Sequence, residues 1–262
     1  MSNKVKNRWM IVGAAFCAAL FLFSGVMLCR EYLDQKQSAE AFDDVAVLVK
    51  EDVEPLVLEL ENQPSPEQVE LTAFEKYADV YAQNSDLVGW VSIPDTRIDY
   101  PVMQTKDTPN FYLKHAFDKS YSSYGVPYMQ ENCDIGISDN LVLYGHHMNN
   151  GSMFSDLCQY ASEDFYQEHK TIRFDTLDDF GEYEVIAAFK TVAYSEEGFK
   201  YYHFVNADNA EDFEEYIGKC KELALYDTGV TAEYGDELIT LSTCEYSRMN
   251  GRMVVVAKKI DA

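Results

Sequence analysis

The chain has 262 residues, of which 47% are hydrophobic, and a formal net charge of −24. This is enough for one domain of moderate size with appendages, and too much apolar and aromatic content for a disordered chain. A surface so acidic disfavours electrostatic binding to nucleic acid or to an anionic membrane surface, so no nucleic-acid partner is expected. A cationic or amine-bearing substrate would instead be attracted.

The N-terminal region contains a long uncharged stretch, residues 9–29. At the helical rise of about 1.5 Å per residue it would span roughly 30 Å, the thickness of the bilayer core. Lys4, Lys6 and Arg8 precede it, which favours a cytoplasmic N-terminus with the remainder outside. A cleaved signal peptide has an apolar region of about 7–15 residues, shorter than this one. We therefore expect a cytoplasmic segment 1–8 and an uncleaved anchor 9–29 in the cell membrane, with an extracellular catalytic domain.

Residues 30–66 are expected to link the anchor to that domain. The first part, 31–50, reads as a polar helix that continues from the anchor, and 51–66 is acidic and contains three prolines, as in a stalk. Ser65 and Pro66 resemble the start of a helix that would reach Asn84. Its apolar face would carry Val69, Phe74, Tyr77 and Tyr81. The catalytic domain would then comprise residues 67–262.

Beyond Gly89 the sequence changes to short β-type runs separated by turn residues. Eight strands are predicted, at residues 90–93, 98–102, 125–129, 141–145, 171–176, 183–192, 237–243 and 252–260. Between them, 154–169 and 210–225 have helical patterns. Many short strands with few helices are typical of a closed or nearly closed β-barrel, here a mainly β fold with additional helices.

The last two predicted strands form a hairpin that places a thiol beside a cation. Asn250 and Gly251 are a turn signal directly before the final strand. If Cys244 lies opposite Arg252, their Cβ atoms are roughly 4.5–5.5 Å apart on one face. A neighbouring positive charge favours the reactive thiolate, and the guanidinium can also stabilise an oxyanion on an attacked carbonyl. The alternative is a small buried cysteine beside a surface arginine, and spacing alone leaves both open.

The six cysteines include no C-x-x-C pair, so neither a structural zinc site nor a thioredoxin-type motif is expected. Two lie in the anchor, and Cys133, Cys158, Cys220 and Cys244 lie beyond it. Whether any of these four are paired is left open by the sequence.

Among the five histidines, His146 follows the apolar run 141–145, which ends at Gly145. Catalytic groups often lie in a loop at the end of a strand, although a single histidine is more often structural. His147 is the next residue, and position alone does not distinguish the two.

Several motifs together resemble those of sortases. They are Val142-Leu-Tyr-Gly-His-His-Met148 with Met153-Phe154, Thr240-Leu-Ser-Thr-Cys244, and Gly251-Arg-Met-Val-Val255. Asp86-Leu-Val-Gly-Trp-Val-Ser-Ile93, Ile98-Asp-Tyr-Pro-Val102, Tyr112-Leu113 and the helical insert 210–225 are similar to class B sortases in particular. The resemblance covers residue 67 to the C-terminus. It implies a membrane-anchored cysteine transpeptidase of Gram-positive bacteria on an eight-stranded β-barrel, without a cofactor.

The resemblance also implies residue roles. Cys244 would be the nucleophile, His146 the family histidine with His147 a variable neighbour, and Arg252 the family arginine. Leu113, Ser242 and Glu245 match positions that line the substrate groove. Arg248 lacks the Gly-Arg-apolar context. The loop between Cys244 and Arg252 is shorter than in some class B members. An asparagine expected shortly before Tyr112 is displaced, since Pro109 stands at its place and Asn110 one later.

The partners implied are secreted proteins with a C-terminal sorting motif, and an amine of peptidoglycan or of a pilin as acceptor. An L,D-transpeptidase also uses Cys, His and Arg, but with the arginine two residues after the cysteine, whereas Arg252 follows Cys244 by eight. A membrane-anchored surface protein without catalytic activity is the third alternative.

Overall fold

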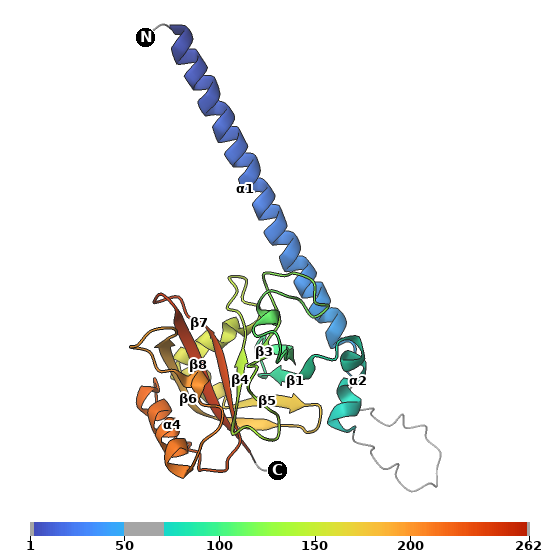
Figure 1. Ribbon diagram of the computed structural model, residues 1–262, viewed down its shortest axis with the longest axis vertical. Coiled ribbons are helices and arrows are strands. Elements are labelled where there is room, and N and C mark those ends of the chain that lie inside the picture. The colour runs from blue at the N-terminus through green and yellow to red at the C-terminus, as the bar shows by residue number, and fades with distance from the viewer. Residues whose placement is uncertain (1–2, 50–70, 261–262) are drawn as a thin grey trace, which may run out of the picture. The chain divides into compact units, whose positions relative to one another are not determined.

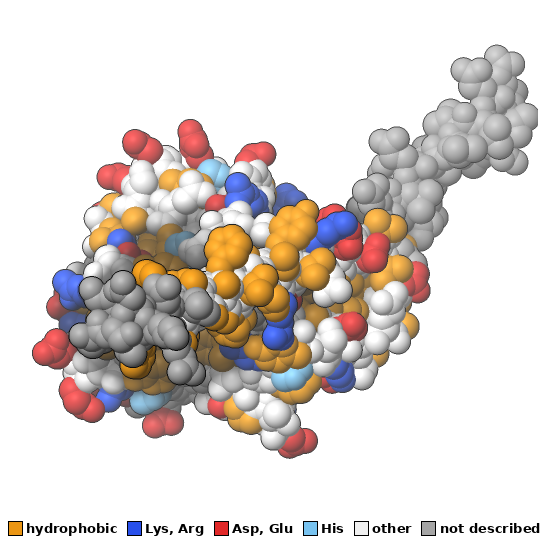
Figure 2. Space-filling view, turned by 90° about the horizontal axis from the view of Figure 1, so that it is seen from above, with side chains coloured by type: hydrophobic (Ala, Val, Ile, Leu, Met, Phe, Trp, Pro, Cys, Tyr) orange, Lys and Arg blue, Asp and Glu red, His pale blue; other side chains and the backbone are white. Residues whose placement is uncertain are grey.

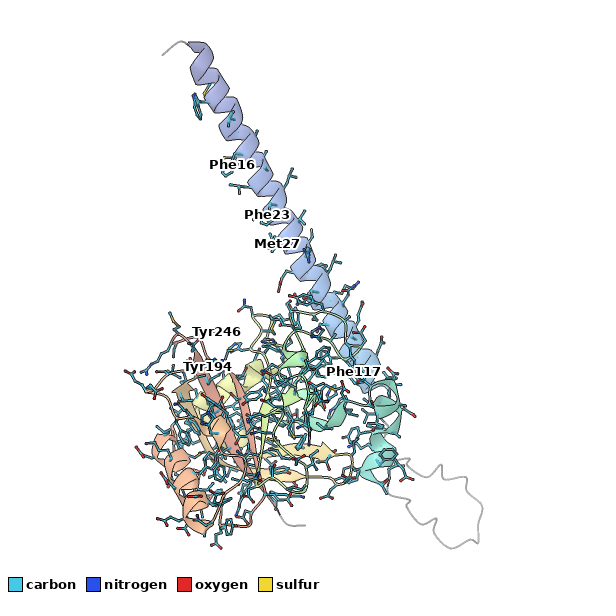
Figure 3. All side chains as sticks on the ribbon, in the orientation of Figure 1. Phe16, Phe23, Met27, Phe117, Tyr194 and Tyr246 are labelled. Carbon is cyan, nitrogen blue, oxygen red and sulfur yellow. The ribbon has the colours of Figure 1, made fainter. Side chains whose placement is uncertain are left out.

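The computed structural model describes residues 3–49 and 71–260, which divide into two compact units, Met1–Ala41 and Phe42–Ala262. The first unit is part of α1 (Asn3–Ala46), a helix of 44 residues. Phe16, Phe23 and Met27 project from it and are exposed (Figure 3). By length and composition, the part from Val12 onward includes a stretch able to cross a membrane. The helix runs without a break from the apolar stretch through the polar residues that follow it, as far as Ala46.

The second unit is a closed barrel with strand order β1-β2-β3-β4-β7-β8-β6-β5 (Figure 1). All eight predicted strands are present, with ends shifted by up to three residues. Their bounds are β1 Leu87–Ser92, β2 Asp99–Met103, β3 Tyr128–Met129, β4 Asn140–Tyr144, β5 Thr171–Thr176, β6 Glu182–Val192, β7 Leu238–Cys244 and β8 Gly251–Lys259. The predicted barrel is confirmed.

The adjacent strands β4, β7 and β8 position His146, Cys244 and Arg252. β4 and β7 are parallel, with Tyr144 paired to Ser242, and β7 and β8 are antiparallel. β7 is buried from Leu238 to Thr243, and both the helix α4 (Ala210–Leu223) and the 3-10 helix η2 (Phe154–Ala161) contact it. On the α4 side, the Tyr216 hydroxyl lies 3.2 Å from the Thr240 hydroxyl. Burial on both faces explains why these strands lack a simple alternation of polar and apolar residues.

The helix before the barrel begins later than the sequence suggested. Thr72 caps α2 (Ala73–Gln83), and its capping box with Glu75 satisfies the backbone N–H groups of the first turn. Ser65, Pro66 and Val69, with the whole of the predicted stalk 51–66, lie outside the described residues. Tyr77 is buried as expected, but Phe74 is 51% exposed, because the helix turns that side to solvent.

The predicted helix 154–169 is two shorter elements, η2 and the α-helix α3 (Glu163–Glu168). Ser162 separates them with extended backbone angles, φ −100° and ψ 129°. Two further 3-10 turns, η1 (Phe111–Leu113) and η3 (Tyr201–His203), lie in the long connections.

Candidate active site

The β7–β8 hairpin pairs Cys244 directly with Arg252, as the spacing predicted. The turn that closes it depends on two residues. Asn250 has a φ of +57°, a left-handed conformation that asparagine tolerates. Gly251 has no room for a Cβ atom, which would overlap the carbonyl oxygen of Glu245. The Asn-Gly pair therefore lets the two strands remain in register up to the thiol.

His146 reaches the same place through the parallel pair β4–β7. Past the last paired position, the Gly145 N–H donates to Ser242 O (3.2 Å) and the Thr243 hydroxyl to Gly145 O (2.8 Å). His146 and Cys244 each lie two residues beyond the Tyr144–Ser242 pair on neighbouring strands. Gly145 is again obligatory, since a Cβ there would overlap the Phe154 ring. The tertiary pairing thus places His146 at the same end of β7 as Cys244 and Arg252.

The His146 ring is held by a backbone carbonyl of the loop in front of it. Its Nε2 lies 2.7 Å from Leu113 O, so the proton on Nε2 is donated to that oxygen. Burial lowers the pKa of His146; the hydrogen bond to Leu113 opposes this shift and the charge of Lys114 adds to it. The pKa is lowered overall, which favours the neutral ring near pH 7.

Arg252 is left without a carboxylate partner. Its Nη1 donates to Gly251 O (2.9 Å) and its guanidinium carbon lies 5.9 Å from the centre of the Tyr194 ring. None of the ion pairs between described residues includes Arg252, so its remaining donors are available to a bound group. Arg248 lies in the exposed loop 245–250, away from the paired position.

The thiols of the second unit differ in environment. Burial raises the pKa of Cys133 to about 11 and that of Cys220 to about 12. Burial also raises the pKa of Cys158 to about 11. These three thiols are therefore protonated near neutral pH, and all are free, as is the partly exposed Cys244. Cys244 is the thiol that has a cation on the paired strand.

The three residues expected in a substrate groove have distinct surroundings. Leu113 is 37% exposed beside His146. Ser242 is buried, and its hydroxyl lies 2.6 Å from the Tyr201 hydroxyl. The Glu245 carboxylate pairs with Lys190 (3.1 Å) and accepts from Ser247. Burial raises the Glu245 pKa, but the hydrogen bonds from Ser247 and Lys190 outweigh this and lower it overall.

A cavity of about 430 Å³ adjoins these residues, and sequence reasoning missed it. Tyr201 links it to Ser242, and Tyr194, whose ring lies under Arg252, lies at the same end of β7 and β8 as Tyr246 (Figure 3). Its lining consists mainly of tyrosines and amides: Asn110, Tyr128, Gln130, Glu131, Asn132, Tyr144, Ala193, Tyr194, Tyr201, Tyr202 and His203. Amides and hydroxyls beside aromatic rings suit an extended peptide. The cluster of tyrosines before the helical insert was the available sequence signal.

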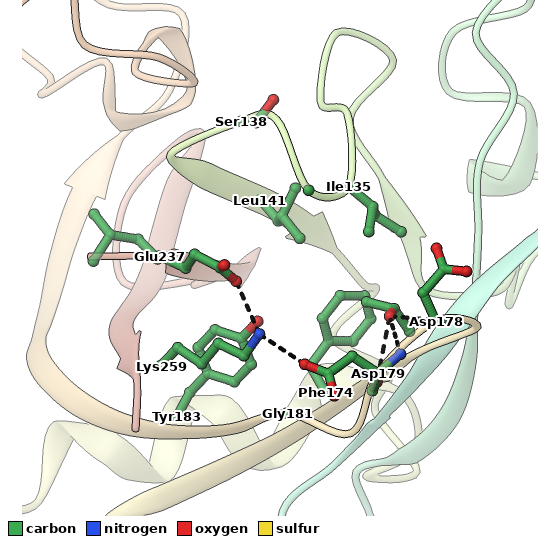
Figure 4. Close-up of a pocket in the computed structure, with 13 residues that line it drawn as sticks. Ile135, Ser138, Leu141, Phe174, Asp178, Asp179, Gly181, Tyr183, Glu237 and Lys259 are labelled. Carbon is green, nitrogen blue, oxygen red and sulfur yellow. Dashed lines mark hydrogen bonds and ion pairs between the residues drawn. The ribbon is translucent and has the colours of Figure 1, made fainter. Parts of the chain in front are cut away.

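A second cavity, of about 220 Å³, lies at the end of the β7–β8 hairpin away from Cys244 (Figure 4). Its lining includes Glu237, which directly precedes β7, and Lys259, the last residue of β8. Here the cation is neutralised, because Lys259 Nζ lies 3.0 Å from both Asp179 and Glu237 carboxylates. Acidic side chains are also spread around the periphery of the molecule (Figure 2).

Comparison with known proteins agrees with this geometry. The sortase domain family matches residues 91–260. Sortase B of Listeria monocytogenes is 30% identical over 92% of each chain. Among solved structures, the Staphylococcus aureus sortase B–substrate complex is 31% identical over 72% of this chain and 86% of that one, with a TM-score of 0.66. Sortase B from B. anthracis is 26% identical over 88% of this chain and 100% of that one, with a TM-score of 0.72.

The chain belongs to the sortase family. Within it, the relatives are class B enzymes, and the chain is a class B sortase. It is thus a cysteine transpeptidase that cleaves a C-terminal sorting signal of secreted proteins through a thioacyl intermediate and transfers the protein to an amine. These comparisons lend no support to an L,D-transpeptidase or to a non-catalytic surface protein.

Proposed function

We propose that Cys244 is the nucleophile, Arg252 the oxyanion donor and His146 the acid and base of this reaction. The observation that carries the proposal is the strand register, which pairs Cys244 with Arg252 and brings His146 alongside. The free guanidinium of Arg252 supports its part, since a paired arginine would have no donors to offer.

The reaction follows from these positions. The neutral His146 ring takes the proton of the Cys244 thiol as the sulfur attacks the scissile carbonyl carbon, and the oxyanion accepts hydrogen bonds from Arg252. The C–N bond breaks as His146 gives a proton to the leaving amine, which leaves a thioester on Cys244. An acceptor amine then attacks the thioester, loses a proton to His146 and releases the thiol. Peptidoglycan and pilin amines are the acceptors we propose.

The tyrosine-lined cavity supports a path for the sorting signal. It begins at Tyr201, which is bonded to Ser242, and ends near Arg252 and Tyr194. Leu113, on the other side of His146, would contact the peptide at the scissile bond. Glu245 would contribute from the β7–β8 loop while bonded to Lys190. A peptide seated in this groove presents its carbonyl to Cys244.

The membrane arrangement is also a proposal. Segment 1–8 would be cytoplasmic, 9–29 the anchor, 30–66 the link and 67–262 the extracellular catalytic domain. A candidate span within α1 supports the anchor. Val45, 4% exposed, packs in a cluster with Tyr77 and Trp90, so the residues before the stalk also contribute to the folded unit.

The test uses the full chain in detergent with a library of quenched sorting pentapeptides and a nucleophilic amine. We expect cleavage and an amide product, with a thioester on Cys244 trapped at low pH and identified by mass spectrometry. Cys244→Ala should show neither. Cleavage by Cys244→Ala at the parent rate would refute the proposed nucleophile.

A further inference from the structure

His147, the neighbour of the proposed acid, touches the backbone of the nucleophile. Its Nδ1 lies 3.0 Å from the carbonyl oxygen of Cys244. A carbonyl oxygen only accepts hydrogen bonds, so Nδ1 carries the proton and donates it. Protonation of the ring leaves this donor in place, since both nitrogens then carry hydrogen. The contact therefore holds in both charge states of His147.

Both the ring and the backbone of His147 are held by neighbouring residues. The Tyr246 hydroxyl donates to the His147 carbonyl (2.9 Å), and the two ring centres lie 5.0 Å apart. Cys158 Sγ lies 3.3 Å from His147 Nδ1 and 3.7 Å from Cys244 O. A β-bridge to Met153 holds the backbone. A ring held in this way can act as a rigid support.

We propose that His147 is a positioning residue that sets the place of Cys244 relative to His146. The β4–β7 pairing ends at Tyr144 and Ser242, so the backbone beyond needs other links. The side chain of His147 bonds the carbonyl of Cys244, and its own carbonyl receives the hydroxyl of Tyr246 from the β7–β8 loop. The loops that carry acid and nucleophile are thereby tied together in both directions.

The consequence is kinetic, and it rests on the proposed roles of Cys244 and His146. A displacement of about 1 Å at a reacting group can cost roughly a hundredfold in rate. Loss of the single neutral hydrogen bond from His147 should displace Cys244 by less than about 1 Å. We therefore expect kcat to fall roughly fivefold. Since His147 contacts neither cavity, the Michaelis constant should stay unchanged.

Two variants of equal shape test this role. His147→Asn keeps an N–H close to the position of Nδ1, whereas His147→Leu has the same outline without a donor. We expect His147→Leu to lower kcat roughly fivefold with KM within about twofold, and His147→Asn to restore kcat to within about twofold of the parent. The assay is cleavage of the best library pentapeptide by the full chain in detergent, normalised to the amount of Cys244 that iodoacetamide labels.

Tyr246→Phe removes the reciprocal bond and keeps the ring, so it gives an independent measurement. We expect Tyr246→Phe to lower kcat less than His147→Leu does. In the double variant, the fold-loss of kcat should be smaller than the product of the two single fold-losses, since both bonds join the same two loops. Tyr226→Phe is the matched control. It also removes a hydroxyl that donates to a backbone carbonyl, that of Tyr160, and should leave kcat unchanged.

A parental kcat for His147→Leu, or a kcat for His147→Asn as low as that of His147→Leu, overturns the positioning role. The second result would mean that the imidazole itself transfers protons. If His147→Leu does not fold, judged by its melting transition, Tyr246→Phe decides, and a parental kcat for that variant also overturns the proposal. None of these outcomes bears on the proposed role of Cys244 as the nucleophile. An active Cys244→Ala variant would instead refute the proposed function.

Discussion

The two ends of the β7–β8 hairpin each hold a cation, and they use it differently. At one end Arg252 is paired with Cys244 and has no carboxylate partner among the described ion pairs. At the other, Lys259 lies between the carboxylates of Asp179 and Glu237. A cation whose donors are satisfied adds stability but has nothing to offer a substrate. The unpaired one costs stability and keeps its donors for chemistry, so only the first end is suited to catalysis.

The largest effects are expected at the thiol and its acid. Cys244→Ala should abolish turnover, and His146→Gln should lower it by about a hundred- to ten-thousandfold, the usual contribution of general acid–base catalysis. Single-turnover cleavage of a quenched peptide measures both. Turnover of His146→Gln within tenfold of the parent would show that another group supplies the proton.

Arg252→Lys tests whether the geometry of the free cation matters. Lysine keeps the charge but loses the planar fork, and removal of an oxyanion donor typically costs about a hundred- to a thousandfold in rate. Arg248→Ala, the matched loop variant, should lose little. The rate of peptide cleavage decides, together with the pH dependence of Cys244 alkylation. Near-parental turnover by Arg252→Lys would reduce Arg252 to an electrostatic neighbour of the thiol.

Lys259→Met tests the other end and should change stability alone. Burial lowers the pKa of Lys259, but hydrogen bonds to Asp179 and Glu237 outweigh it and raise the pKa overall. The stabilisation is therefore full below the unfolded pKa of about 10.4 and is lost as the pH rises through the higher folded value. We expect the free energy of unfolding of the variant to be lower by up to about 1 kcal/mol at pH 7, and its turnover to be unchanged.

The readout for Lys259→Met is chemical denaturation at pH 7 and at pH 11. The difference between variant and parent should shrink at the higher pH. A variant with reduced turnover but parental stability would contradict the division of labour between the two ends.

Glu245→Gln gives the smallest expected change and sharpens the boundary of the catalytic end. The lowered pKa of Glu245 means that its pairing with Lys190 stabilises the fold above the ordinary value of 4.5. That stabilisation is lost as the pH falls through the folded pKa. The ion pair is partly exposed, so we expect Glu245→Gln to lower the free energy of unfolding by at most about 0.5 kcal/mol at pH 7. Melting from pH 7 to pH 3 tests this, and an increase in KM would support contact with substrate.

Fold class and strand content were predictable because each strand has its own local signal. The apolar β-branched run from Met253 to Ala257 and the Asn250-Gly251 turn predict a hairpin without any knowledge of the rest. The register of that hairpin followed as well, since a turn of known length sets which residues face each other. The helix 154–169 was predicted in one piece because its apolar periodicity continues across Ser162, where the extended backbone breaks it.

The sequence by itself determined the eight strands, the hairpin and the pairing of Cys244 with Arg252, because these depend on residues close together in the chain. Only the tertiary structure decided which histidine faces which group. His146 donates to Leu113 and His147 to the carbonyl of Cys244. Both contacts join residues more than thirty positions apart, the first to the 3-10 turn η1 and the second from beyond the end of β4 to the end of β7. The side-chain direction at the end of a parallel strand is set by the neighbouring strands and loops, so it cannot be predicted from the residues next to it in the sequence.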